Sequence, residues 1–211
     1  MNYATFRKLV LRHIDQYTIA GSVIPDTYNN QADDTSKIPD LTNVVLREIA
    51  TTTRPLMATL DPNAPDFEGR QEMGNGWTKI TMPADFWQVT GRGMPKFNAD
   101  GQFERTMEYY YVTNNELMFR TSDLVNTMLT YYRYPRVCHG NPDEILDCSD
   151  PAADAASYYV AAELVRDDNA FAYSVLHNQF EDLNAKLQRP MTAEMIPVRD
   201  AYFGNWACPY C

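Results

Sequence analysis

Hydrophobic positions near the start of the chain recur at intervals of three and four residues. Such spacing places them on one face of a helix, which is predicted over residues 2–19 and ends before Gly21. A second helix is predicted over residues 38–53, with Ser36 as its cap and Pro39 in its first turn. Residues 26–35 fit either a loop or an early helical stretch that Pro39 kinks. The apolar stripes are Tyr3, Phe6, Val10, His13 and Tyr17 in the first helix, and Ile38, Leu41, Val45 and Ile49 in the second.

The same helical period returns after residue 149. Asp150 is predicted to be an N-cap residue and Pro151 the first helical residue, and residues 152–166 continue the helix. After an interruption at residues 167–169, a further helix runs to Pro190. Its stripe is Leu176, Phe180, Leu183 and Leu187.

The middle of the chain has the alternating pattern of strands. Residues 61–76 contain several Pro and Gly and predict a loop or an extended connection. Asn114 and Asn115 predict a tight turn between two strands, because Asn tolerates positive φ. The predicted strands form a small antiparallel module of about four or five members, over residues 77–82, 86–91, 107–113, 116–120 and 125–134.

These elements predict an α+β fold. The helical segments 1–56 and 150–190 would form a four-helix-type bundle, with residues 57–149 as an inserted β module. Residues 191–211 have neither period and are predicted to be an extended C-terminal arm. Because this arm carries Tyr202, Phe203 and Trp206, it is expected to cover a neighbouring surface.

Charge and composition narrow the function classes. The chain has 211 residues with a formal net charge of −10, which disfavours tight binding to the phosphates of DNA. No apolar run approaches the ~20 residues of a membrane span. The first residues lack the pattern of a signal peptide. We therefore expect the protein to be made in the cytoplasm, where a reducing environment keeps its cysteines as thiols.

The four cysteines allow several interpretations. Cys208 and Cys211 have the Cys-x-x-Cys spacing of thiol-redox sites, but such a site needs a helix after its first Cys. The same pair could bind zinc together with Cys138, His139 or Cys148. Free thiols, or a disulfide formed outside the cell, are the remaining alternatives.

No segment predicts an active site. The three histidines are far apart in the sequence, and no nucleophile or phosphate-binding motif is present. An acidic run is interpreted as a solvated loop that leads to a helix start, where negative charge is favourable. It comprises Asp143, Glu144, Asp147, Asp150 and Asp154. We therefore expect no enzyme activity and no cofactor.

Three segments, in their order and spacing, carry a resemblance to a known family. They are Met82-Pro83-Ala84-Asp85-Phe86-Trp87-Gln88-Val89, Tyr131-Tyr132-Arg133-Tyr134-Pro135, and Tyr158-Tyr159-Val160-Ala161-Ala162-Glu163-Leu164 through Asp167-Asp168-Asn169. Together they resemble the head–tail connector, or adaptor, proteins of tailed bacteriophages. The resemblance covers residues 3–190 and leaves the C-terminal arm unmatched.

The resemblance implies a structural role in the neck of a virion. Such proteins form closed rings, often of twelve subunits, below the portal, and contact the portal and the next connector or tail component. DNA would pass through the ring without specific binding. Tyr158 and Tyr159 join Tyr202, Phe203 and Trp206 as expected interface residues. Another neck or tail-completion protein, or a small zinc or thiol-redox module, is the alternative.

Overall fold

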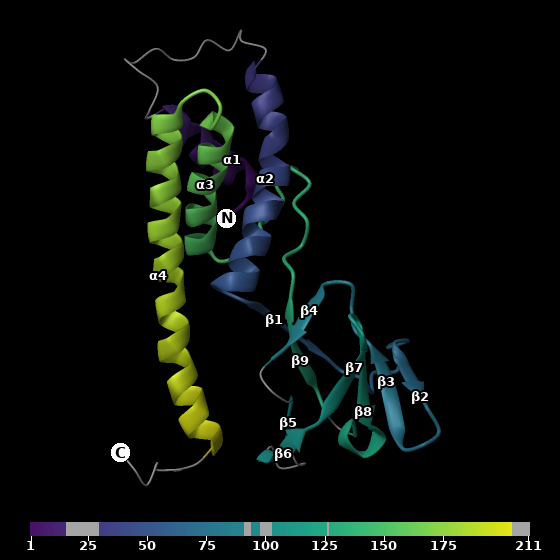
Figure 1. The fold of residues 1–211 in the computed structure, drawn as a ribbon. Coiled ribbons are helices and arrows are strands. Elements are labelled where there is room, and N and C mark those ends of the chain that lie inside the picture. The colour runs from purple at the N-terminus through teal and green to yellow at the C-terminus, as the bar shows by residue number, and fades with distance from the viewer. Residues whose placement is uncertain (16–29, 91–93, 98–102, 126, 204–211) are drawn as a thin grey trace. The chain divides into compact units, whose positions relative to one another are not determined.

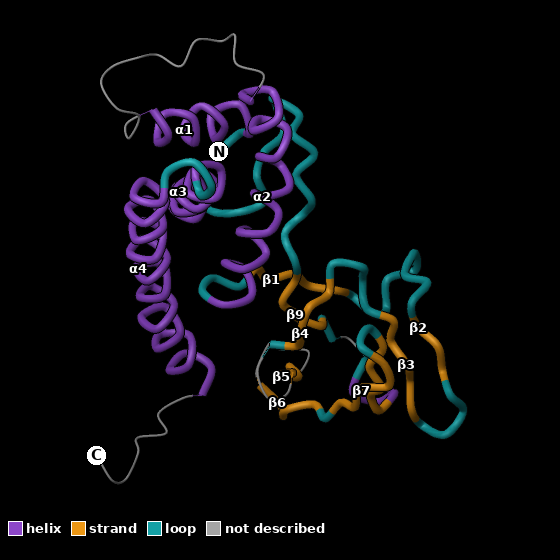
Figure 2. Tube along the Cα trace, turned by 45° about the horizontal axis from the view of Figure 1, so that its top comes forward, coloured by secondary structure: helices purple, strands orange, loops and turns teal. Residues whose placement is uncertain are grey.

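The computed structural model describes residues 1–15, 30–90, 94–97, 103–125 and 127–203. Its internal contacts divide the chain into two compact units. One comprises Met1–Pro55 and Pro135–Met191, and the other comprises Leu56–Tyr134 and Thr192–Cys211. Figure 2 shows that the helices and the strands separate into different parts of the molecule.

The helical unit is built around an alanine-rich helix. Helix α3 (Asp150–Val165) buries residues on most of its circumference, so neighbouring helices approach its backbone closely. Helix α1 (Tyr3–Asp15) packs against α3 through the predicted stripe of Tyr3, Phe6, Val10 and His13. The buried positions of α3 are Ala152, Ala153, Ala155, Ala156, Ser157, Val160, Ala161 and Ala162.

Helix α2 (Asn30–Thr52) begins earlier than the sequence pattern predicts. Pro39 lies inside it, so the predicted start near residue 38 is wrong. Of the two alternatives for residues 26–35, a loop or an early helical stretch, the helix is the one observed from Asn30 onward. Proline lacks a backbone N–H and so removes one hydrogen bond from the helix. The helix continues because apolar residues before and after Pro39 pack against the core. Ile38, Val45 and Ile49 of that face are buried against α3 and its neighbours.

Helix α4 (Ala170–Phe203) runs through Pro190, where a helix end was predicted. The extended arm predicted for residues 191–211 is therefore wrong as far as Phe203, and residues 204–211 lie outside the described part of the chain. Pro190 and Pro197 both lie inside this helix, and the good helix formers between them, Met191, Ala193, Glu194 and Met195, outweigh them. In the helical unit, Leu176, Phe180 and Leu187 of α4 belong to the buried core.

The strand-rich unit contains nine strands in its described residues, grouped in three antiparallel sheets. A three-stranded sheet has the order β1-β9-β4, a four-stranded sheet has the order β2-β3-β8-β7, and β5 pairs with β6. The bounds are Leu56–Leu60 (β1), Arg70–Glu72 (β2), Trp77–Thr81 (β3), Phe86–Val89 (β4), Met94–Phe97 (β5), Phe103–Met107 (β6), Tyr109–Thr113 (β7), Glu116–Arg120 (β8) and Leu129–Arg133 (β9), with a short 3₁₀-helix at Thr121–Asp123 between β8 and β9.

Both larger sheets contribute to one hydrophobic core. Phe86 and Leu129 come from the three-stranded sheet, and Ile80, Leu117 and Phe119 come from the four-stranded sheet. The alternation that predicted these strands is visible in β3 and β8, where every second residue is buried. Such one-sided burial leaves the opposite face of each sheet for solvent or partners.

The predicted fold class needs correction. The chain is α+β with four helices in its described part, but the strands form sheets of three and four members and not one small module. Sequence reasoning missed four strands, namely β1, β2, β5 and β6. Residues 135–149, grouped with the β module by sequence, have their contacts in the helical unit.

Candidate interaction surfaces

Two residues predicted to face partners lie in the helical unit and make contacts there. Tyr158 stacks on His13, with ring centroids 3.8 Å apart. Tyr159 meets Phe180 edge to face at 5.2 Å. Both tyrosines are half-buried, so packing within the unit uses part of each ring. Tyr202 and Phe203 are the last residues of α4, and Trp206 lies outside the described residues.

The buried His13 is held in its neutral form. Its Nε2 atom lies 3.1 Å from the Ser157 hydroxyl, while Nδ1 is buried without a hydrogen-bond partner. Burial lowers the pKa of His13, and the nearby Arg12 lowers it further. The sequence predicts a packing or an interface residue at His13, and its 6% exposure agrees with packing inside the helical unit.

The described cysteines are both free thiols in the helical unit. Cys138 is buried, and burial raises its pKa; burial also raises the pKa of Cys148 to about 11. Among the described residues, no three His, Cys, Asp or Glu side chains are grouped so that they could hold a metal ion. Cys208 and Cys211, the other half of the zinc and redox interpretations, lie outside those residues.

Two members of the acidic run order the loop before α3. Glu144 Oε2 accepts a hydrogen bond from the backbone N–H of His139 at 2.9 Å, and Asp147 accepts one from the backbone N–H of Arg136 at 2.8 Å. Helix α3 begins at Asp150 with Ser149 as its N-cap residue, one position earlier than predicted. These carboxylates therefore organise the backbone, which spacing in the sequence did not indicate.

An aromatic cluster lies on the face of the three-stranded sheet opposite its core. Trp87 of β4 lies 6.0 Å from the Tyr132 ring of β9 and 6.4 Å from that of Tyr134. On the adjacent edge strand, Met57 pairs in register with Tyr132 and is 64% exposed. Large aromatic groups on a half-exposed sheet face are typical of protein interfaces.

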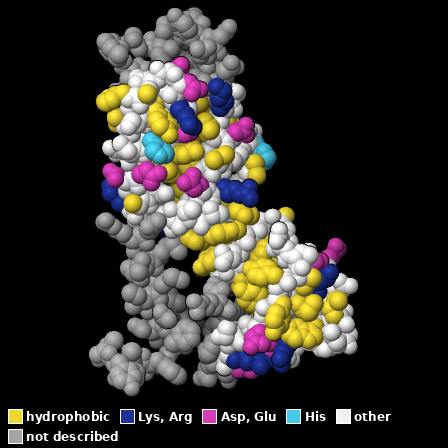
Figure 3. All heavy atoms as spheres, in the orientation of Figure 1, with side chains coloured by type: hydrophobic (Ala, Val, Ile, Leu, Met, Phe, Trp, Pro, Cys, Tyr) yellow, Lys and Arg dark blue, Asp and Glu magenta, His cyan; other side chains and the backbone are white. Residues whose placement is uncertain are grey.

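A second aromatic surface lies on the four-stranded sheet. Trp77 of β3 meets Tyr110 of β7 at 5.5 Å, and the Arg120 guanidinium lies 5.7 Å from the centre of the Trp77 ring. Strand β7 is an edge strand, and Tyr110 and Tyr111 are more than half exposed. On the face shown in Figure 3, hydrophobic side chains gather over the strand-rich unit.

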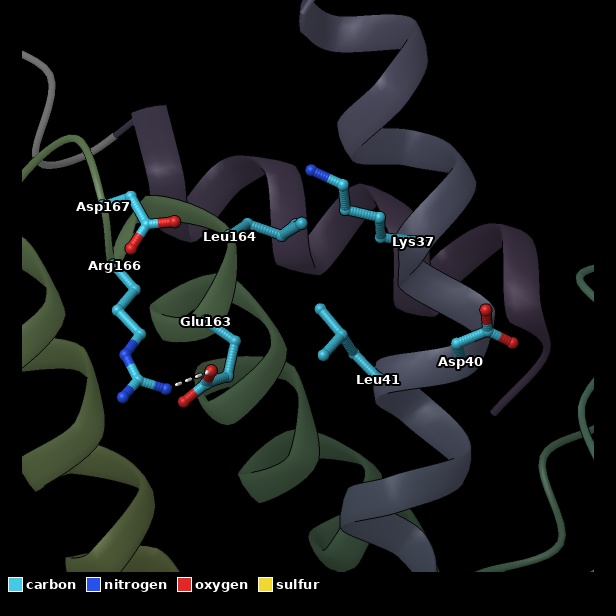
Figure 4. Close-up of a pocket in the computed structure, with 7 residues that line it drawn as sticks. All are labelled: Lys37, Asp40, Leu41, Glu163, Leu164, Arg166 and Asp167. Carbon is cyan, nitrogen blue, oxygen red and sulfur yellow. Dashed lines mark hydrogen bonds and ion pairs between the residues drawn. The ribbon is translucent and has the colours of Figure 1, made fainter.

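A cavity with a volume of about 520 Å³ lies between α2 and the end of α3. Leu41 and Leu164 form an apolar wall, while Lys37 and Asp167 stand on opposite sides of the opening (Figure 4). At its lower edge Arg166 pairs with Glu163 at 3.2 Å. Because its charges are of both signs, the cavity does not select one ligand charge.

No protein-family model matches the chain, and no curated protein matches it in sequence. In the described part of the chain, no helix combines the length and the apolar character that crossing a membrane requires.

Proposed function

We propose that the chain is a structural virion protein of the head–tail connector type. In this proposal it forms a ring below the portal, joins the capsid vertex to the tail, and acts without catalysis or a cofactor. Its partners are further copies of itself, the portal protein and the next connector or tail protein. It is made in the bacterial cytoplasm and ends in the neck of the virion.

The observation that carries the proposal is the junction between two of the three segments that resemble the family. The Asp85 carboxylate accepts a hydrogen bond from the Tyr131 hydroxyl at 3.1 Å, and its backbone carbonyl accepts one from the Tyr134 N–H at 2.7 Å. Phe86 packs on the Tyr131 ring. The two segments thus form one structural feature where the chain leaves the strand-rich unit, which favours a shared architecture over chance similarity.

The third segment supports the same proposal in the helical unit. It forms the second half of α3, where Val160, Ala161 and Ala162 are buried at the centre of the packing. The aromatic surfaces on both larger sheets add the exposed area that an assembly subunit needs. With a net charge of −10, a ring of such subunits would let DNA pass without holding it.

Electron microscopy of negatively stained particles tests the proposal. The full chain is mixed with the portal protein encoded in the same genome, and we expect an added ring on the tail side of the portal. A chain truncated after Pro190, which lacks Tyr202, Phe203 and Trp206, should bind more weakly. Portal particles that stay bare at micromolar concentrations of the full chain would contradict the proposal.

DNA passage has its own test. Duplex DNA in low salt should not be retained by the purified chain in a filter-binding or mobility assay, because the acidic surface repels phosphate. Tight, salt-sensitive binding of DNA would contradict this part of the proposal.

A further inference from the structure

Helix α1 carries an unpaired basic surface in an acidic protein. Arg7, Lys8 and Arg12 are exposed on this helix, outside the buried stripe, and no carboxylate occurs between Tyr3 and Ile14. None of these three cations forms an ion pair with the described residues. Cations left without partners are available to a carboxylate of another molecule.

A cavity of about 300 Å³ opens beside this surface. Ala4, Leu11 and Pro142 give it apolar walls, and Arg7 and Lys8 stand at its rim. This volume admits one aromatic side chain. The combination of apolar walls with a basic rim fits an apolar group that has carboxylates next to it.

The same unit has an exposed apolar group with carboxylates next to it at the start of α4. Residues 143–182 contain ten carboxylates and a single cation, Arg166, which is paired with Glu163. Phe171, in the first turn of α4, is 74% exposed. Asp167 and Asp168 immediately precede that turn and are exposed as well. Phe171, Asp167 and Asp168 therefore form an acidic, aromatic projection, which we call the Phe171 knob.

We propose that the Phe171 knob of one copy inserts into the α1 cavity of a second copy. Phe171 would fill the apolar pocket while Asp167 and Asp168 pair with Arg7 and Lys8. The contact joins two different surfaces, so it is head-to-tail, and repetition of it leads to a ring or an open chain. This inference rests on the proposed function, because it names the contact by which the subunits assemble.

Charge explains why a second copy is the occupant. Two chains that each carry a net charge of −10 repel one another at long range, except where the basic face of α1 meets an acidic surface. The exposure of Phe171 shows that the described part of its own chain leaves it uncovered. Duplex DNA fits less well, because its bases are stacked inside the helix and its phosphates would meet the carboxylates that follow Pro142.

The experiment compares variants of the full chain by sedimentation velocity. Arg7→Glu with Lys8→Glu removes the basic rim, and Phe171→Ser removes the knob. Each should weaken self-association about tenfold or more. The control, Arg136→Glu with Lys186→Glu, changes the net charge equally at exposed positions without ion pairs and should assemble as the parent does. Because all substituted side chains are exposed, each variant should fold as the parent does. An unchanged melting temperature in thermal unfolding checks this.

Mixing the two defective variants distinguishes this contact from others. Each variant alone stays monomeric, but the Phe171→Ser chain keeps its cavity and the Arg7→Glu, Lys8→Glu chain keeps its knob. Their mixture should give a 1:1 heterodimer in native mass spectrometry and no larger species. Variants that assemble like the parent, a mixture that stays monomeric, or a parent chain that never associates would each overturn the inference.

DNA binding that is lost in the Arg7→Glu, Lys8→Glu chain, without any effect on assembly, would also overturn it. Portal binding is measured separately. If the chain binds the portal but these substitutions do not change its self-association, the proposed contact is wrong. The proposed function would not be contradicted by that result.

Discussion

The Asn43 side chain of α2 forms hydrogen bonds with both backbone groups of Cys138, its N–H and its carbonyl. Its Nδ2 donates to the Cys138 carbonyl at 3.0 Å, and its Oδ1 accepts from the Cys138 N–H at 2.7 Å. The side-chain amide thus satisfies the backbone donor and acceptor of a residue that lies outside any strand. Through this pair, α2 holds the segment that leads to α3 from a distance of 95 residues along the chain.

Replacing Asn43 with Ala should destabilise the helical unit by about 2 kcal/mol, because a backbone donor and acceptor beside the buried Cys138 lose their partner. Chemical denaturation followed by circular dichroism measures the change. Asn178→Ala, at an exposed position of α4, is the matched control and should stay within about 0.5 kcal/mol of the parent. Equal stability of both variants would show that the pair contributes nothing.

Gly140 lies where only glycine fits well. Its φ is +81°, and a Cβ atom there would approach Cγ of Pro39 to 2.9 Å. Gly140→Ala should therefore cost about 2 kcal/mol or more, since a left-handed backbone and a contact with a rigid ring both oppose the new methyl group. Gly74→Ala is the control, because Gly74 has a φ of +75° but open space around it, and it should cost about 1 kcal/mol less.

His13 should make the helical unit sensitive to mild acid. Its pKa in the folded state lies below the ordinary value of 6.5, so the unfolded chain binds the proton more readily. Stability should be full above pH 6.5 and should fall as the pH drops below it. In His13→Gln, the free energy of unfolding should change less between pH 7 and pH 5.5. An identical decline in parent and variant would exclude His13 as the cause.

Tyr131 should have the opposite effect at alkaline pH. Burial and the neighbouring Asp85 raise its pKa to about 12, so the folded state disfavours the phenolate. Stability from this residue is present below the ordinary pKa of 10 and is lost as the pH rises from 10 towards 12. Tyr131→Phe should lose about 1 kcal/mol at neutral pH and show a smaller alkaline decline.

Tyr110→Phe serves as the control for Tyr131, because its ring is 55% exposed on edge strand β7. Its free energy of unfolding should equal that of the parent at neutral and at alkaline pH in the same denaturation experiment. If both Phe variants show the same alkaline profile, then the pair of Asp85 and Tyr131 does not set the pH dependence.

Ala156 tests the close packing around α3. It is fully buried among the helices, so Ala156→Leu should destabilise the unit by about 1–3 kcal/mol through overpacking. Ala170→Leu adds the same side chain at the exposed start of α4 and should be nearly neutral. Thermal unfolding of the two variants gives the comparison, and equal melting temperatures would show that the core tolerates the extra volume.

Strands β3 and β8 could be predicted because each alternates buried and exposed residues over its whole length. Strand β1 was missed, since Leu56–Leu60 follows Pro55 and precedes Pro62 and offers little local pattern. It is a strand because β9 supplies its hydrogen bonds, from Leu56 opposite Arg133 to Leu60 opposite Leu129. Likewise the surface of Trp77, Tyr110 and Arg120 needs three strands in register, which no local pattern predicts.

By itself, the sequence determined which face is apolar in the helices and strands that it predicted, because a period of 3.6 or 2 residues acts within one element. It also determined the acidic character of the chain and the aromatic positions. The tertiary structure decided which faces meet. Asn43 with Cys138 and Asp85 with Tyr131 are joined across 95 and 46 residues, where no local period reaches. The pairing of β1 with β9 was decided in the same way.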